Sequence, residues 1–294
     1  MTAADGPRVA VVVKPADDPQ QRAELAAALS AAGLTVMGWW ETTASQPGTS
    51  QARAAVAAGA DLVVVQGGDG TVRSVAAALL GTDVALALVP AGTGNLLARN
   101  LGIPAQPAAA AALAATGARR RIDVVELDDE PYLVMGGCGF DARMFAATSP
   151  ALKQRAGWLA YVVAGLRALR SPAVGVRLES DGRIARTRAT GVVVGNVASL
   201  TGGVALLPDA RPDDGLLDVA VLTAARPREW LGLGWRLLAH RPPTRGQLRR
   251  FTGHAVDVVW DVDQPAQVDG DVIASRRTAR FRVRPQALTV CVPR

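Results

Sequence analysis

The sequence predicts an α/β protein: a doubly wound, mostly parallel sheet layer followed by a C-terminal antiparallel β-sandwich domain. Apolar runs of strand length alternate with helical segments over the first 125 residues. Two glycine-rich segments directly follow two of these runs, and from about residue 124 onward the segments become short, turn-rich and alternating. Strands that are apolar on both faces and separated by helices are typical of parallel sheets with helices on both sides.

The N-terminal half gives the order of this layer. Its patterns predict strands at 8–13, 34–40, 61–65 and 84–89, and helices at 20–32, 51–58, 72–80 and 105–118. The segments QGGDGT (66–71) and PAGTGN (90–95) each come directly after a strand. We therefore expect both loops at the carboxyl ends of parallel strands, where open α/β sheets bind ligands.

The C-terminal half alternates apolar and polar residues at 174–180, 190–197, 216–222, 256–263 and 279–285, and helical patterns interrupt it at 151–169 and 227–239. Asp181–Gly182, Asp214–Gly215 and Asp269–Gly270 are turn signals, and we place only the first cleanly between two strands. We set a nucleotide-binding α/β domain at 1–124 and a β-rich lipid-binding domain at 125–285, with the tail 286–294 as a candidate to pack back on the first.

Charge and composition narrow the classes of partner. The net charge of +6 and the pI near 10.3 favour anionic partners such as nucleotides or acidic lipid headgroups. No stripe of basic and aromatic residues marks a nucleic-acid surface, so no nucleic-acid partner is expected. Cys138 and Cys291 fit a reducing compartment, and we find neither a signal-peptide layout nor a run of about 18 apolar residues. We expect a cytoplasmic protein that contacts anionic membranes peripherally, and a homodimer stays open.

The first glycine loop has the chemistry of an anion site. Gly67, Gly68 and Gly70 allow backbone N–H groups to close on a phosphate, and the following helix adds the positive end of its dipole. The loop lacks the Walker A lysine and the G-x-G-x-x-G spacing. Asp69 at its centre would repel a phosphate unless it faces a cation or a donated hydrogen bond. The alternative is that Asp69 caps the helix expected at Val72.

The paired loops resemble those of the diacylglycerol-kinase catalytic-domain family, which includes bacterial lipid kinases and sphingosine kinases. The first loop alone also occurs in NAD kinases and is similar in phosphofructokinases. Three further segments match the family in order: GGCGFDA (136–142), GNVASLTGGVALLPDARPDDGLLDV (195–219) and VDGD (268–271). The resemblance covers most of the chain and implies an N-terminal layer like that of NAD and diacylglycerol kinases, with ATP and Mg²⁺ as cofactors.

The resemblance implies that the two loops hold ATP. The implied contacts are Gly67, Gly68, Asp69, Gly70, Thr71, Val72, Arg73 and Ser74 around the first loop, Gly92, Thr93 and Asn95 in the second, and Thr43. Arg73 and Ser74 depart from the family, which carries Asn and Glu there. At residues 13–17 the family's NP turn is also changed, and Lys14 is a candidate phosphate contact.

The resemblance also implies the catalytic acids. Asp271 matches the general base, usually Glu, which takes the proton of the lipid hydroxyl as it attacks the γ-phosphate. Asp269 is a candidate to assist it. Asp123 matches an acid at the domain junction, expected near Asp69 and Mg²⁺. The plain alternatives are a DG turn with solvated acids and, for Asp123, an ordinary position at a strand edge.

The resemblance also implies a second Mg²⁺ site in the segment PDDG (212–215) and its flanks. Asp214 matches its side-chain ligand, and the carbonyls of Arg211 and Leu216 complete the protein part, a set of oxygens that suits a hard cation. The alternative is that this segment is only a turn.

These matches imply an ATP-dependent lipid kinase that phosphorylates the hydroxyl of diacylglycerol to give phosphatidic acid. One alternative is a kinase for a sphingoid base, another long-chain lipid or NAD. A second is a catalytically weak or inactive member that binds nucleotide or lipid, and a third is a basic protein that binds membranes or nucleic acid by charge. Trp158, Trp230 and Trp235 lie in the helical interruptions beside arginines, and we leave both membrane contact and core packing open for them.

Overall fold

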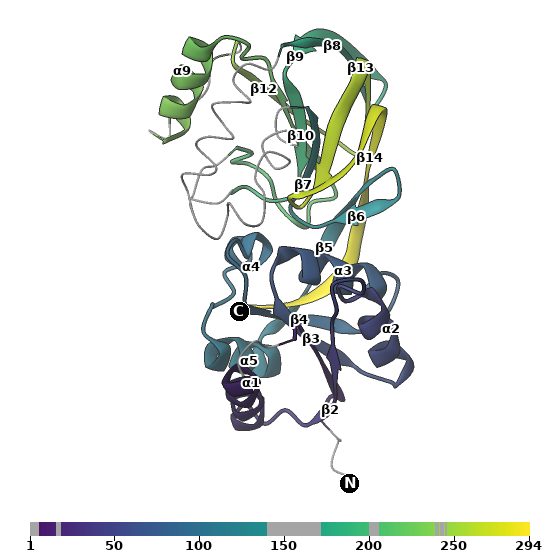
Figure 1. Ribbon diagram of the computed structural model, residues 1–294, viewed down its shortest axis with the longest axis vertical. Helices are drawn as coiled ribbons and strands as arrows, with labels where there is room; N and C mark the ends of the chain where they lie inside the picture. Colours follow the sequence, from purple (N-terminus) through teal and green to yellow (C-terminus); the bar gives the residue numbers. More distant parts are fainter. Residues whose placement is uncertain are drawn as a thin grey trace. The chain divides into compact units, whose positions relative to one another are not determined.

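The computed structural model describes residues 6–15, 19–139, 172–199, 206–238, 241, 244 and 246–294. The expected helix at 151–169, Trp158, and parts of two motifs (140–142 and 200–205) lie outside the described residues. The chain divides into two units (Figure 1): residues up to Asp123 together with Gln286–Arg294, and residues Val124–Pro285. The strands β5 and β14 contribute to both units.

The N-terminal unit is built on parallel strands in the order β4-β3-β1-β2. Their bounds are β1 Val9–Val13, β2 Val36–Glu41, β3 Leu62–Gly67 and β4 Ala85–Pro90. The end of β14 adds a parallel neighbour to β4, with Val290 opposite Leu86. Apolar residues suit these strands because β1 is buried on both faces, and β3 and β4 are buried on both faces almost throughout. Neighbouring strands satisfy the hydrogen bonds of their backbone groups.

Helices cover both faces of this sheet, which confirms the predicted doubly wound layer. They are α1 Pro19–Ala31, α2 Thr49–Ala57, α3 Asp69–Leu79, α4 Leu96–Asn100 and α5 Pro107–Thr116. Val9, Val11 and Val13 pack in one core with residues of α1 and α5. Ala10 and Val12 point to the opposite face and are equally buried. The structure adds α4, which we did not predict, and α3 begins three residues before the expected Val72.

The C-terminal unit is antiparallel throughout its described pairings, as predicted. Its strands are β5 Ala118–Leu127, β6 Glu130–Tyr132, β7 Met135–Gly139, β8 Val174–Ser180, β9 Arg183–Ala189, β10 Gly191–Gly195, β11 Leu217–Leu222, β12 Leu248–Gly253, β13 Ala255–Val268 and β14 Asp271–Val292. The helix α9 spans Pro227–Leu238. Tyr132, Trp260 and Phe281 fill the core between the strands.

The prediction that only Asp181–Gly182 lies cleanly between two strands is wrong. Asp269–Gly270 joins β13 to β14 as a two-residue hairpin, just as Asp181–Gly182 joins β8 to β9. Asp269 and Gly270 have φ values of 47° and 87°, which is the left-handed pair that such hairpins require. We missed this hairpin because the polar, arginine-rich start of β14 does not look like a strand. No helix in the described parts of the chain is long and apolar enough to cross a bilayer.

Candidate active site

The two glycine loops begin at the same edge of the N-terminal sheet. β3 and β4 are parallel neighbours with Gly67 opposite Pro90, and the Ala91 N–H donates to the Gly67 carbonyl at 3.0 Å. The first loop passes through Gly68 into α3, and the second runs through 91–95 into α4. The prediction that both loops lie at the carboxyl ends of adjacent strands is therefore confirmed.

The loops touch each other through their backbones. A Cβ atom at Gly92 would lie 2.6 Å from the Cα atom of Gly68, so only glycine fits at residue 92. Asn95, at φ 48°, closes the second loop: its Oδ1 accepts the Gly92 N–H at 3.0 Å and its Nδ2 donates to the Gly92 carbonyl at 2.7 Å. The Asn95 amide, expected to contact nucleotide, thus bonds its own loop.

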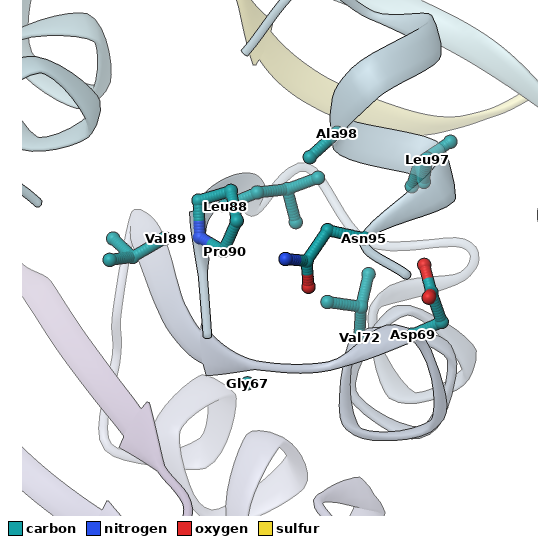
Figure 2. A pocket seen from close by; sticks show the side chains of 9 residues that line it. All are labelled: Gly67, Asp69, Val72, Leu88, Val89, Pro90, Asn95, Leu97 and Ala98. Carbon is teal, nitrogen blue, oxygen red and sulfur yellow. The ribbon is translucent and has the colours of Figure 1, made fainter. Parts of the chain in front are cut away.

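Asp69 links the first loop to the second. Its Oδ1 accepts the Leu96 N–H at 2.7 Å, and Figure 2 shows its carboxylate directed toward α4. Burial raises the pKa of Asp69 above its ordinary value, and nearby backbone amides, chiefly that of Leu96, oppose the rise by stabilising the ionised form. A Cβ atom at Gly94 would lie 2.7 Å from the other oxygen, Oδ2, so this glycine makes room for the carboxylate.

The alternative that Asp69 caps its own helix is wrong. The N-cap of α3 is Gly68, in an extended conformation and without a side-chain cap, and Asp69 is already the first helical residue. A helix start is usually capped by the side chain of its N-cap residue, and Gly68 has none, while the carboxylate of Asp69 binds the start of α4 instead. This contact also explains how a carboxylate is accommodated in a loop suited to phosphate.

The start of α3 can bind an anion. Its first N–H groups have no carbonyl partner within the helix and carry the positive end of the helix dipole. The cavity beneath the loops measures about 10 Å³, and Figure 2 shows its mainly apolar lining, which includes Val72, Leu88 and Leu97. A space of this size holds at most one water molecule. The loops therefore rest on packed side chains, and this cavity is too small to hold a nucleotide.

The other residues expected around ATP occupy several positions. Thr93 is exposed in the second loop and Thr71 packs against Gly67. The Ser74 hydroxyl donates to the Gly70 carbonyl at 2.8 Å, one turn back in α3. Arg73 is half-buried on α3. Thr43 is exposed in the turn after β2, where its hydroxyl accepts the Gln46 N–H at 3.0 Å.

Asp123 is fully buried at the end of the N-terminal unit. Its Oδ1 accepts the Gln286 N–H at 2.7 Å, where β14 returns to this unit in the left-handed conformation with φ 50°. The alternative of an ordinary strand-edge acid is therefore wrong, because edge acids are solvated. Within the described ranges, no three His, Cys, Asp or Glu side chains gather as a metal site, around Asp69 and Asp123 or elsewhere.

Asp269 anchors the hairpin that precedes Asp271. Its Oδ1 accepts the N–H groups of Val134 and Met135 at 2.9 and 3.0 Å, and its Oδ2 accepts that of Leu133 at 3.0 Å. The alternative of a turn with solvated acids is wrong for Asp269, because its carboxylate is bound by the loop before β7. Asp271 is exposed as the first residue of β14.

We expect Asp269→Ala to destabilise the C-terminal unit by at least about 3 kcal/mol, because three backbone amides lose their acceptor and each unsatisfied amide costs about 1–3 kcal/mol. Asp181→Ala is the matched control, since Asp181 occupies the same hairpin position but is solvent-exposed, and its carboxylate accepts the His254 N–H at 3.1 Å. Denaturant unfolding of both variants checks this expectation. Equal losses of unfolding free energy in the two variants would mean that the three bonds to Asp269 add no stability.

The implied second metal loop is a turn preceding β11. Asp214 Oδ1 accepts the Leu216 N–H at 3.0 Å, and Gly215 follows with φ 73°.

Asp218 on β11 is 7% exposed, and its pKa is raised to about 6, first by burial and then by the charges of Asp214 and Asp209. Sequence reasoning missed Asp218, although an acid inside the otherwise apolar strand LDVAVL was the available signal. The metal-ligand role of Arg211, Asp214 and Leu216 stays a prediction.

Comparisons with known proteins agree with this architecture. The family model for the diacylglycerol kinase catalytic domain matches residues 13–127, and the model for the YegS C-terminal NAD kinase beta sandwich-like domain matches residues 135–292. A Pseudomonas putida protein named "Probable lipid kinase YegS-like" is 35% identical over 263 residues, 88% of this chain and 85% of the relative. A namesake from Pseudomonas aeruginosa is 36% identical over 242 residues, 81% of this chain and 79% of the relative.

A crystal structure of a diacylglycerol kinase from Bacillus anthracis shares the fold. It superposes with a TM-score of 0.79 at 22% identity, over 99% of this chain and 98% of that one.

Proposed function

This chain belongs to the diacylglycerol kinase family of lipid kinases, and we propose that it transfers the γ-phosphoryl group of ATP to the hydroxyl of diacylglycerol, giving phosphatidic acid and ADP. The observation that supports this most directly is the convergence of two glycine loops, in which Gly68 meets Gly92 and Asp69 binds the Leu96 N–H. Such a pair of strand-end loops suits a polyphosphate.

The N-terminal unit binds the nucleotide in this proposal. The first amides of α3 bind phosphate oxygens, together with the amide and the hydroxyl of Thr93 in the second loop. Gly68 and Gly92 allow the phosphates to approach the backbone closely because neither carries a side chain.

The residues present fit a magnesium ion. Magnesium is usually held by one or two protein carboxylates together with substrate phosphates and waters, so a set of three protein ligands is not required. Asp69 offers such a carboxylate beside the loops: Oδ1 is bound to Leu96 and Oδ2 faces Gly94. When bound, the ion would neutralise charge on the phosphates during transfer.

The C-terminal unit supplies the base. Asp271 accepts the proton of the acceptor hydroxyl as its oxygen attacks the γ-phosphorus, and the bond from that phosphorus to the β-phosphate oxygen breaks to release ADP. Asp271 is exposed, as a group that meets a substrate must be, and Asp269 fixes the hairpin that presents it. Because Tyr132, Trp260 and Phe281 fill the described core, we place the acyl chains outside that core.

A second candidate is a member of the family that binds nucleotide or lipid without efficient transfer. The observations that favour it are the aspartate at residue 271, where the resemblance implies glutamate, and the Ser74 hydroxyl bound back to Gly70. A shorter acid reaches less far toward a hydroxyl, and a hydroxyl bonded within α3 is less available to a ligand.

The experiment that tests the proposal incubates the pure protein with labelled ATP and Mg²⁺. The acceptors are diacylglycerol or sphingosine in mixed detergent micelles, and NAD in solution. We expect label in phosphatidic acid, and Asp271→Ala prepared in parallel controls for contaminating kinases. Label only in another acceptor would overturn the choice of diacylglycerol, and ATP binding without any labelled product would favour the second candidate.

A further inference from the structure

The helix α9 presents two large apolar side chains to solvent. Leu231 and Trp235 are 70% and 69% exposed, more than the other large apolar side chains of the described residues. They are four residues apart, and exposed Arg228 precedes Leu231 by three, so all three lie on one face of the helix. Leu233 lies on the opposite face and is 2% exposed.

This exposed face is held in place from behind. The Glu229 carboxylate accepts the N–H groups of Ala225 and Arg226 at 2.9 and 3.1 Å, which caps the start of α9. Gln247 Nε2 donates to the Glu229 carbonyl at 3.0 Å and ties the helix to the segment before β12. The acid of this segment is thus turned away from the face of Leu231 and Trp235, and Figure 1 shows α9 beside the strands of its unit.

The net positive charge of the protein is concentrated around this helix. Residues 223–253 contain seven of the 32 basic residues and one of the 26 acids, which leaves 25 of each in the rest of the chain. Arg226, Arg228 and Arg241, just before, within and just after α9, are exposed. An exposed leucine and tryptophan between arginines match an anionic surface with an apolar interior.

We propose that α9 docks this protein on anionic phospholipid membranes. Leu231 and Trp235 insert at the level of the headgroups and the first methylenes, while Arg226 and Arg228 contact lipid phosphates. The proposal rests on the proposed function in that a kinase for a membrane lipid must reach the bilayer surface. Charge alone would also attract nucleic acid, but a nucleic-acid surface gives no reason for Leu231 to be exposed.

The test measures sedimentation with vesicles of phosphatidylcholine, with or without phosphatidylglycerol, in the absence of ATP and diacylglycerol. We expect binding only to the anionic vesicles, weakened by salt. Leu231→Ser with Trp235→Ser is expected to weaken it at least about tenfold. Arg226→Gln with Arg228→Gln is expected to weaken it by about fivefold for each charge removed.

Matched controls replace exposed side chains of the same kind elsewhere. They are Met37→Ser with Ile184→Ser for the apolar pair, and Arg183→Gln with Arg186→Gln for the arginines. Unchanged vesicle binding by the Leu231/Trp235 variant, an equal loss in its control, or tighter binding to RNA than to anionic vesicles would overturn the proposal.

Kinase assays separate failure of this inference from failure of the proposed function. With a short-chain diacylglycerol dissolved as monomers, the α9 variants are expected to keep wild-type turnover, whereas on vesicles they are expected to lose it in proportion to binding. Binding that depends on α9, in a protein that phosphorylates no diacylglycerol, would support docking and refute the proposed substrate. Full turnover on monomeric diacylglycerol, with equal vesicle binding by all variants, would support the proposed substrate and refute docking through α9.

Discussion

Replacing Asp69 with asparagine is expected to lower turnover at least about a hundredfold and to leave the fold unchanged. Asparagine keeps an oxygen that accepts the Leu96 N–H, so the two loops stay joined. It removes the negative charge that we propose holds the divalent metal beside the phosphates, and metal stabilisation of a transferring phosphoryl group is worth several kcal/mol. The measurement is kcat with saturating ATP and lipid, together with the melting temperature.

Asp69→Ala separates the two uses of this carboxylate. Alanine leaves the Leu96 amide without its acceptor in a half-buried position, which costs about 1–3 kcal/mol and releases the second loop. We therefore expect a lower melting temperature, and weaker binding of metal-free ATP by calorimetry, in Asp69→Ala, but neither effect in Asp69→Asn. Near-normal kcat in Asp69→Asn would remove the charge of Asp69 from the mechanism and leave it a structural link.

The placement of the glycine loops was predictable because it follows from a rule about parallel strands. β3 and β4 could be recognised from their apolar runs, and the carboxyl ends of neighbouring parallel strands meet at one edge. The contact of Asp69 with Leu96 could not be predicted in the same way. The helix α4 has only five residues, too few to show a periodic pattern, and its first amide is bound by a residue 27 positions earlier.

The role of Asp269 had no local signal. A DG dipeptide predicts a turn, but the three amides that bind its carboxylate come from residues more than 130 positions away in the sequence. Only the fold brings the loop before β7 to the hairpin between β13 and β14. Likewise, Asp123 looks like an edge acid in the sequence, and its burial depends on the return of the chain at Gln286.

Asp271→Ala is expected to lower kcat by at least about a hundredfold, since a positioned general base contributes about 10²–10⁴-fold. Asp271 is exposed, so we expect a smaller change of melting temperature than in Asp269→Ala. Asp271→Glu is expected to keep or raise kcat, because the longer side chain reaches further toward the hydroxyl and matches the residue implied by the resemblance.

The roles of Asp269 and Asp271 should therefore be distinguishable by experiment. Asp269→Ala loses stability because the Asp269 carboxylate binds three amides, and Asp271→Ala loses turnover with a smaller change in stability. Rapid mixing with diacylglycerol and labelled ATP, followed by single-turnover analysis, would locate the Asp271→Ala defect in the chemical step. Unchanged single-turnover rates in Asp271→Ala would mean that this aspartate is a turn residue, and the base would have to be sought elsewhere in the chain. A loss of turnover in Asp271→Glu equal to that in Asp271→Ala would mean that the position of the carboxylate, set by the hairpin, matters more than its reach.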